Sequence, residues 1–407
     1  MRILHVVPSY YPAVRYGGPI RSVHGLARAL ARRGHEVHVY TTNVDGPSEA
    51  DVPLGRAVDL DGISVWYFPT SRGRRLFRST DMRRALDINI SGFDLVHTHS
   101  VFLWPTTAAA RAARAYRVPY VLAPRGMLVA DLMRRKSRLA KLAWMVAFER
   151  RNVEAATAVH VTSQLEADDI ARLGLRCQRL IIIGNGSEIP ASGGSTHCGV
   201  AGIRDHFTVL FLGRISWKKG LDRLIPAMLH LPETKLVLAG DDDEGYRAPM
   251  EALAGNLGVA TRVRFIGPVH GPEKWSLLAS AQVLVLPSYS ENFGNVILEA
   301  MAAGCPVVVT PEVGLAGVVS DSGAGLVTPG DAEPLARALR SILMDQNAAR
   351  AMGEAGRKIV AERFTWEVIA GKMEQEYQQI TTDRKRTSDS RGNPHLSLLK
   401  DTRPWLN

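Results

Sequence analysis

The sequence has few cysteines, no long apolar run and no dinucleotide-binding fingerprint of the form G-x-G-x-x-G. Its 407 residues hold three cysteines, Cys177, Cys198 and Cys305, without metal-ligand or redox spacing, which favours a reducing compartment such as the cytoplasm. No window approaches the roughly 18 uninterrupted apolar residues that a membrane span requires. The N-terminal apolar run at residues 3–7 is too short for a signal peptide, so we expect it to form the first strand.

Positive charge is unevenly distributed along the chain. The formal net charge is +10, and residues 1–190 hold 27 Lys and Arg against 16 Asp and Glu, whereas the remainder holds 23 against 24. This asymmetry indicates that one lobe faces something anionic, such as the inner face of a membrane, a lipid diphosphate or nucleic acid. The alternative is that the excess serves solubility alone.

Residues 284–309 combine a strand, a loop, a helix, a turn and a second strand. The leucine and valine run at 283–286 suits a buried parallel strand, and a helical pattern that begins near Phe293 ends at Gly304. A helix that starts at the carboxyl end of a parallel strand points its free amides into the ligand crevice of an open α/β sheet. We therefore expect the amides around residues 294–296 to face a ligand.

Two glutamates lie in this stretch, Glu291 in the loop and Glu299 inside the helix. An ionised carboxylate only accepts hydrogen bonds, which suits a ligand rich in hydroxyl groups, such as a sugar or a ribose. The alternative is that both glutamates are surface charges without a ligand. Their spacing alone does not separate these two possibilities.

Two other segments offer groups that suit a diphosphate. The segment 213–220 follows an apolar strand and carries Arg214 and Lys219, whose cations can converge on a ligand at the strand end. Solvated loop charges are the alternative. Near the N-terminus, Gly17 and Gly18 precede a helix whose N-terminus could also meet a diphosphate.

Polar side chains follow two more expected strands in the first half. His97 and His99 alternate along the strand 94–100, so they share one face and could both reach the cleft. We expect a hydrogen-bonded structural role or an acceptor contact for them, because no third metal ligand is apparent. Arg125 follows another strand, and its five donors suit a phosphate or an acidic sugar, with a structural ion pair as the alternative.

The stretch SENFGNVILEAMAAGCPVV at residues 290–308 resembles the Glu, seven residues, Glu signature of retaining glycosyltransferases of family 4. The glycine loop at 17–18 and the cation pair in 213–220 resemble further motifs of that family, and the resemblance covers about the first 380 residues. It implies an α/β GT-B fold, in which two facing Rossmann-like domains with parallel sheets are joined by a C-terminal crossover helix. It also implies a nucleoside diphosphate sugar donor, no cofactor and no metal.

The resemblance also implies roles for individual residues. Arg214 and Lys219 are expected to be catalytic through the diphosphate, and Glu291 through the transferred sugar, while Glu299 is expected to hold the ribose. Other substrate contacts are expected from Gly17, Gly18, Arg125, Asn292, Phe293, Gly294, Asn295 and Val296. The PRGML sequence at 124–128 departs from the family pattern, because many members carry a histidine there, so no catalytic histidine is expected.

These patterns divide the chain into two domains. Residues 1–190 are expected to form an acceptor-side domain, 191–206 a linker and 207–364 a domain that binds the nucleotide sugar. Residues 365–380 are expected to form the crossover helix, and 381–407 a disordered polar tail.

Residues 131–151 combine a basic cluster with several large apolar side chains. This helix either lies at a membrane interface or packs its apolar side into the first domain. In the second case the basic side chains around Arg134, Arg135 and Lys136 remain in solvent.

The sequence therefore predicts a retaining glycosyltransferase, of hexosyltransferase type, that moves a sugar from a nucleoside diphosphate to a hydroxyl acceptor. By resemblance, we expect a role in bacterial exopolysaccharide or lipopolysaccharide assembly, with a lipid-linked or glycan acceptor and peripheral contact with the inner face of the membrane. The alternatives are a GT-B sugar-nucleotide epimerase and a non-enzymatic, basic nucleic-acid-binding protein. The second lacks an interleaved aromatic and basic platform, so no nucleic-acid partner is expected.

Overall fold

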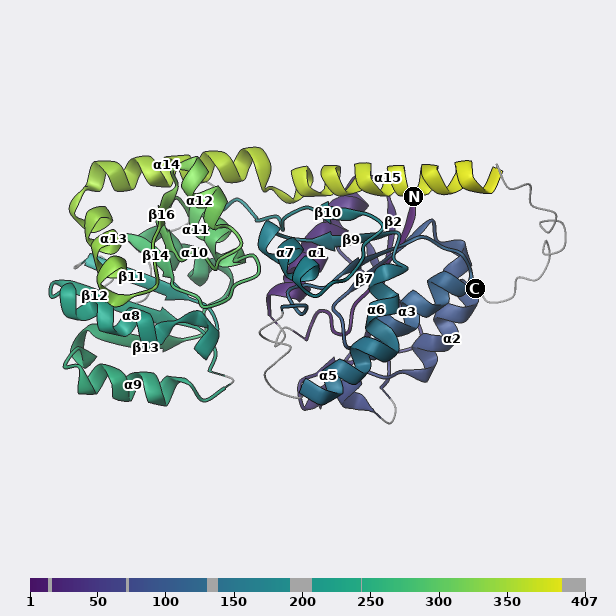
Figure 1. Cartoon of the computed structure of the whole chain (residues 1–407), viewed down its shortest axis with the longest axis horizontal. Helices are drawn as coiled ribbons and strands as arrows, with labels where there is room; N and C mark the ends of the chain where they lie inside the picture. The colour runs from purple at the N-terminus through teal and green to yellow at the C-terminus, as the bar shows by residue number, and fades with distance from the viewer. Residues whose placement is uncertain (14–16, 71–72, 130–137, 191–206, 243, 390–407) are drawn as a thin grey trace.

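The computed structural model describes residues 1–407 except 14–16, 71–72, 130–137, 191–206, 243 and 390–407, and it forms two domains that lie side by side (Figure 1). Each domain is built on a mainly parallel sheet whose central strands are buried, because helices cover both faces. The expected α/β architecture of two facing domains with parallel sheets is confirmed.

The first domain contains one large sheet. Its strands are β1 (Arg2–Val6), β2 (Glu36–Thr42), β5 (Ala57–Leu60), β6 (Ile63–Phe68), β7 (Leu95–His99), β8 (Tyr120–Ala123), β9 (Ala158–Val161) and β10 (Leu180–Ile182). Their spatial order is β10-β9-β8-β7-β1-β2-β6-β5, and the edge strand β5 runs antiparallel to β6. The small strands β3 (Val44–Asp45) and β4 (Ser48–Glu49) form a separate hairpin.

The helices of the first domain connect these strands. They are α1 (Gly18–Arg32), α2 (Thr80–Asn89), α3 (Trp104–Ala115), α5 (Arg138–Trp144), α6 (Arg150–Glu154) and α7 (Gln164–Arg172). Serine side chains start two of them: the Ser79 hydroxyl accepts a hydrogen bond from the Met82 amide, and the Ser163 hydroxyl accepts one from the Glu166 amide. A π-helical turn, Met145–Glu149, joins α5 to α6.

The second domain contains a fully parallel sheet. Its strands are β11 (Phe207–Leu212), β12 (Thr234–Ala239), β13 (Val263–Gly267), β14 (Val283–Leu286), β15 (Val307–Val309) and β16 (Gly325–Val327). Its helices are α8 (Leu221–Ala227), α9 (Arg247–Asn256), α10 (Gly271–Ser280), α11 (Asn295–Ala303), α12 (Ala316–Ser322), α13 (Ala332–Met344) and α14 (Gln346–Arg363).

Both sheets reverse their strand order at one place. In the second sheet the order is β13-β12-β11-β14-β15-β16, so the reversal lies between β11 and β14. In the first sheet it lies between β1 and β7. Open α/β sheets bind ligands outside the carboxyl ends of the strands at such a reversal, so these four strand ends are where a ligand is expected.

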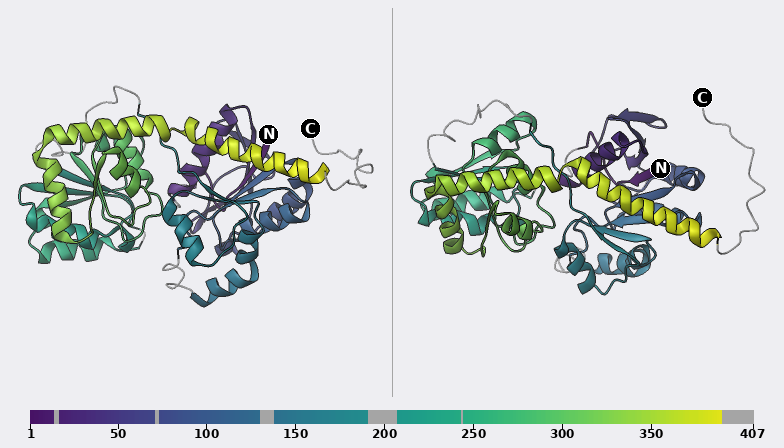
Figure 2. Two further views of the ribbon diagram at one scale, coloured as in Figure 1. Left: turned by 45° about the horizontal axis from the view of Figure 1, so that its top comes forward. Right: turned by 90° about the horizontal axis from the view of Figure 1, so that it is seen from above.

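A long C-terminal helix, α15 (Trp366–Asp389), returns from the second domain to the first. Figures 1 and 2 show α14 along the second domain and α15 across the first, where it packs against α1. Trp366, Ile369, Met373 and Tyr377 form its buried face. The expected crossover helix is therefore present.

Two expectations about helix bounds need correction, and a third expectation is not tested. Helix α15 continues past residue 380 to Asp389, because no Gly or Pro interrupts the sequence in this stretch. Helix α11 begins at Asn295, because Gly294 at φ 94° has a left-handed backbone that cannot belong to it. The expected linker at 191–206 lies outside the described residues.

Candidate active site

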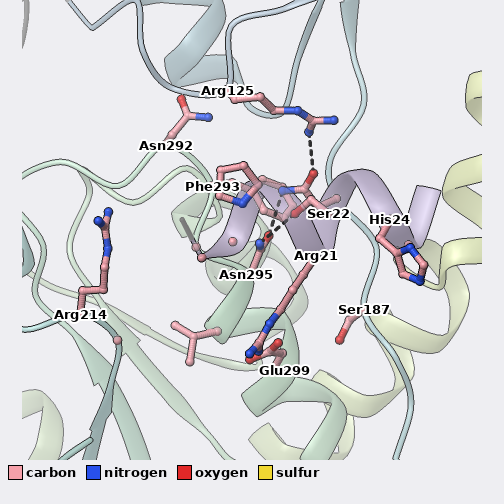
Figure 3. Close-up of a pocket in the computed structure, with 18 of the residues that line it drawn as sticks. Arg21, Ser22, His24, Arg125, Ser187, Arg214, Asn292, Phe293, Asn295 and Glu299 are labelled. Carbon is pink, nitrogen blue, oxygen red and sulfur yellow. Dashed lines mark hydrogen bonds between the residues drawn. The ribbon is translucent and has the colours of Figure 1, made fainter. Parts of the chain in front are cut away.

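One cleft of about 1130 Å³ lies between the two domains, at the strand reversals. Its wall includes every residue that the sequence singled out as catalytic or substrate-binding: Gly17, Gly18, Arg125, Arg214, Lys219, Glu291, Asn292, Phe293, Gly294, Asn295, Val296 and Glu299. Figure 3 shows Arg125 entering from the first domain, and Arg214, Phe293, Asn295 and Glu299 from the second. Their functional roles stay predictions.

Lys219 and Glu291 form an ion pair at the β11/β14 reversal. Gly220 makes this pairing possible, because its φ is 69° and a Cβ there would lie 2.0 Å from the Pro287 carbonyl oxygen. The backbone of Glu291 is also fixed, because its N–H donates a hydrogen bond to the Glu312 carbonyl at 3.0 Å. The two side chains are only 16% and 21% exposed, so neither is a freely solvated surface charge.

Arg214 and Lys218 add positive charge to the same strand end. Arg214 is exposed and makes no hydrogen bond or ion pair with the residues that the structure describes. Burial, and secondarily the nearby Arg214 guanidinium, lowers the pKa of Lys218. Three cations thus face one paired carboxylate, an excess that suits a diphosphate.

Glu299 is paired with Lys274, whose ammonium donates to Glu299 Oε1 at 2.7 Å. The Lys274 side chain is 10% exposed and that of Glu299 21%. Sequence reasoning missed Lys274, although it lies in the first turns of α10, just after the strand end of β13. The search for cations that follow an apolar strand, which found Arg214 and Lys219 after β11, would also have found Lys274. Glu299 Oε2 has no partner among the described residues and remains an acceptor for a ligand hydroxyl.

The loop between Glu291 and α11 touches the first domain. Asn292 Nδ2 donates to Thr162 Oγ1 at 2.9 Å, and the Ser163 hydroxyl donates to the Asn292 carbonyl at 2.7 Å. Asn295 Oδ1 accepts a hydrogen bond from Asn185 Nδ2 at 2.8 Å, and Asn295 Nδ2 donates one to Ser22 Oγ at 3.0 Å. The side chains of Asn292 and Asn295 therefore connect the domains, which leaves backbone amides of this loop for a substrate.

Arg125 reaches the cleft from the loop after β8. Its Nε and Nη2 donate to His99 Nδ1 at 3.3 and 3.2 Å, and its Nη1 donates to Asn185 Oδ1 at 3.0 Å. Burial lowers the pKa of Arg125 to about 10. The structural ion pair that the sequence allowed as an alternative is not formed with any described residue.

His97 and His99 are fully buried and absent from the cleft wall, and both are hydrogen-bonded: His97 to the Tyr377 hydroxyl and His99 to His5 and Arg125. Of the two expected roles, the hydrogen-bonded structural one therefore agrees with the structure. His5 lies beside them, so the third imidazole that the sequence did not reveal is present, and possible ligand atoms of the three lie within 4.8 Å of one another. The Arg125 guanidinium lies 3.2 Å from His99, however, and its charge opposes a dication there.

Hydrogen-bond partners assign the proton positions of this histidine cluster. Arg125 can only donate, so His99 Nδ1 accepts and His99 Nε2 donates to His5 Nδ1 at 2.9 Å. The Ile183 carbonyl can only accept, so His160 Nε2 donates to it at 2.9 Å. Burial is the main cause of the lowered pKa of all four histidines, to about 3 for His5 and His160, so the cluster is neutral.

The fold and the cleft define a two-domain α/β enzyme of the GT-B glycosyltransferase class, and comparisons with known proteins agree. Residues 17–186 match the family model "Glycosyl transferase 4-like domain", and residues 201–359 match "Glycosyl transferases group 1". The chain belongs to this group 1 glycosyltransferase family. The nucleic-acid-binding alternative is therefore wrong.

Individual relatives cover nearly the whole chain. A D-inositol 3-phosphate glycosyltransferase of Xylanimonas cellulosilytica is 31% identical over 88% of this chain and 91% of its own length. A glycogen synthase of Mycobacterium tuberculosis is 30% identical over 93% and 94%. Among solved structures, sucrose-phosphate synthase from Thermosynechococcus elongatus superimposes with a TM-score of 0.74 at 25% identity, covering 94% of this chain and 99% of its own. HepE of Anabaena, solved with UDP-glucose, gives 0.72 at 22% identity, covering 95% and 100%.

Proposed function

We propose that this glycosyltransferase moves a sugar from a nucleoside diphosphate sugar to a hydroxyl acceptor with retention at the anomeric carbon. The observation that carries this proposal is the group of Arg214, Lys218 and Lys219 facing the carboxylate of Glu291 at the β11/β14 reversal. Cations suit the diphosphate and the carboxylate suits the sugar hydroxyls. The HepE structure with UDP-glucose supports a donor of this chemical class.

In the proposed reaction the bond between the anomeric carbon and the β-phosphate oxygen breaks, and negative charge builds on that phosphate. Arg214 and Lys219 stabilise this charge more in the transition state than in the bound donor. Lys219 exchanges the Glu291 carboxylate for the phosphate, so Glu291 becomes free to accept a hydroxyl of the sugar. The acceptor attacks from the departing face, and its proton passes to the leaving phosphate, so retention requires no protein nucleophile. We assign the ribose to Glu299.

A ligand panel tests the donor assignment. We expect UDP-glucose, or another member of a panel of UDP, GDP, ADP and dTDP sugars, to raise the melting temperature of the purified chain by mass action. NMR of the product of the preferred donor should then show the anomeric configuration of the donor retained in a glycoside. Conversion of the donor into its epimer without an acceptor would instead support the epimerase alternative, and no stabilisation by any member would contradict the proposal.

We also propose that the first domain binds a membrane surface through α5 and the π-helical turn, while the acceptor is lipid-linked or a glycan of a cell-surface polysaccharide. Of the two possibilities for 131–151, exposed apolar side chains favour the interfacial one: Leu139 is 81% exposed, Leu142 54% and Val146 74%. Arg134, Arg135 and Lys136 lie outside the described residues. In the described part of the chain, no helix has the length and apolar content to cross a bilayer.

Vesicle binding checks this surface. Replacing Leu139, Leu142 and Val146 together by serine should weaken co-sedimentation with phosphatidylglycerol vesicles by about tenfold or more, because their apolar area no longer enters the lipid. Added salt should also weaken binding of the parent, since basic residues contribute on the order of 1 kcal/mol each.

The matched control for the vesicle experiment replaces three exposed apolar side chains that lie outside α5 and the π-helical turn. Ile88, Leu229 and Met344 are 75%, 50% and 62% exposed, and replacing them together by serine should leave vesicle binding unchanged. If both triple variants bind like the parent, α5 has no membrane role and a soluble acceptor becomes the better hypothesis.

A further inference from the structure

Arg125 is a cation in the cleft wall that no carboxylate of the described residues contacts directly. Its three hydrogen-bond contacts go to neutral acceptors, His99 Nδ1 and Asn185 Oδ1, and it forms no ion pair with the described residues. Glu166 is near enough to attract it electrostatically. The Glu166 carboxylate, however, accepts hydrogen bonds from three other donors: the Gly126 amide at 2.6 Å, the Thr162 amide at 2.8 Å and Asn292 Nδ2 at 3.0 Å.

The surroundings of Arg125 make this charge unfavourable. The histidine cluster next to it is neutral, and burial has lowered the pKa of the guanidinium itself. A charge removed from water destabilises the fold unless an opposite charge compensates it. Arg125 also has a φ of 56°, a left-handed backbone that is unfavourable for a residue with a Cβ. Unfavourable geometry of this kind persists mainly where a functional site requires it.

The hydrogen-bond count shows which donors remain. A guanidinium has five N–H groups, and the contacts to His99 and Asn185 use one on each of Nε, Nη1 and Nη2. One N–H on each terminal nitrogen is left, in the plane of the group. These two N–H groups are available to donate to the oxygens of a carboxylate.

Charge balance favours a carboxylate over a phosphate at this position. A monoanion brings less negative charge close to Glu166 than a phosphate dianion would, so it is repelled less there. The cations that suit a diphosphate, Arg214 and Lys219, enter the cleft from the other domain. Of the other arginines in the cleft wall, Arg28 forms an ion pair with Glu188, Arg21 contacts His270 Nδ1 at 3.3 Å and Arg214 is exposed to water.

We propose that the substrate of this glycosyltransferase carries a carboxylate, that of a hexuronic acid, which binds to the two free N–H groups of Arg125. The inference rests on the proposed function, since it assigns the sugar class to the same cleft. The uronic acid is either the transferred sugar of the donor or the acceptor sugar, and binding experiments distinguish the two sources.

The first arm of the test uses donors. Calorimetric titration of the full chain compares UDP-glucuronic acid with UDP-glucose, and GDP-mannuronic acid with GDP-mannose. If the donor carries the uronate, the acid should bind about tenfold to a hundredfold more tightly than its neutral partner. The preference should disappear in Arg125→Met, while UDP or GDP alone binds that variant as it binds the parent.

The second arm uses acceptor mimics on protein saturated with the nucleoside diphosphate. Methyl glucuronide should bind more tightly than methyl glucoside, by the same ratio, if the acceptor carries the uronate. The matched control Arg28→Gln should keep the preference, because the Arg28 guanidinium is already paired. Should Arg125→Met fold poorly by circular dichroism, Arg125→Lys keeps the charge and loses the paired donors, so its preference should fall to a few-fold.

The outcomes separate this inference from the proposed function. The absence of any Arg125-dependent preference for the acid in both arms overturns the carboxylate site, even where the nucleotide binds normally. If the parent protein binds none of the nucleotides, the donor assignment at Arg214 and Lys219 is contradicted instead.

Discussion

Replacing Arg214 by alanine should lower kcat/KM for sugar transfer by about 30-fold to 1000-fold, equivalent to about 2 to 4 kcal/mol of lost transition-state stabilisation. Arg214 is exposed and makes no contact with described residues that its loss would break, so the melting temperature should stay unchanged. Lys219→Ala should cause a similar loss of rate. It also leaves the Glu291 carboxylate, which is only 21% exposed, without its partner, so this variant should lose some stability as well.

Initial rates with radiolabelled donor measure both variants. The matched control is Arg337→Ala, which removes an arginine paired with Glu333 on α13, outside the cleft wall, and should transfer at the parent rate. Parent-like transfer by Arg214→Ala or Lys219→Ala would show that the residue in question does not act on the diphosphate. A loss in all three variants would indicate a general effect of removing positive charge.

Trp366→Ala should destabilise the chain by about 3 to 5 kcal/mol, the range for removing a large buried aromatic side chain. Trp366 is 8% exposed and opens the crossover helix α15. Two glycines make room for its indole, since a Cβ at Gly25 of α1 would lie 2.2 Å from the ring and one at Gly186 would lie 2.6 Å from it.

Urea unfolding followed by fluorescence and circular dichroism measures this effect. Ile88→Ala serves as the control, because Ile88 is 75% exposed on α2 and its truncation should change stability by less than about 0.5 kcal/mol. A change of less than 1 kcal/mol for Trp366→Ala would mean that α15 is held by other contacts. A transition that splits into two would mean that the domains unfold separately once α15 is released.

Strand ends were the predictable part of this site. Buried parallel strands have continuous apolar runs, so the segments before Arg214 and Glu291 could be located, and the reversal rule indicates where such ends meet. The crossover helix could be predicted from its amphipathic pattern, although its end could not. The apolar pattern fades after Ile380, while no Gly or Pro stops the helix before Asp389.

Pairings between distant elements were not predictable. Nothing in the spacing of Lys274 and Glu299 shows that α10 and α11 bring them to 2.7 Å. The sequence left open whether His97 and His99 of β7 reach the cleft, and it did not show that β1 contributes His5 and β9 contributes His160, which lie beside them. Such contacts depend on strand order, which one sequence does not specify, so the neutral surroundings of Arg125 also became visible only in the structure.

The hydrogen bonds of Asn292 and Asn295 to Thr162, Ser163, Asn185 and Ser22 have a consequence for the equilibrium between open and closed arrangements of the domains. Each contributes on the order of 1 kcal/mol to the closed one, so four together outweigh much of the entropy of free domain rotation. Apparent affinity falls in proportion to the fraction of molecules in the binding-competent arrangement. These four bonds therefore reduce the part of the donor's binding energy that goes into bringing the domains together.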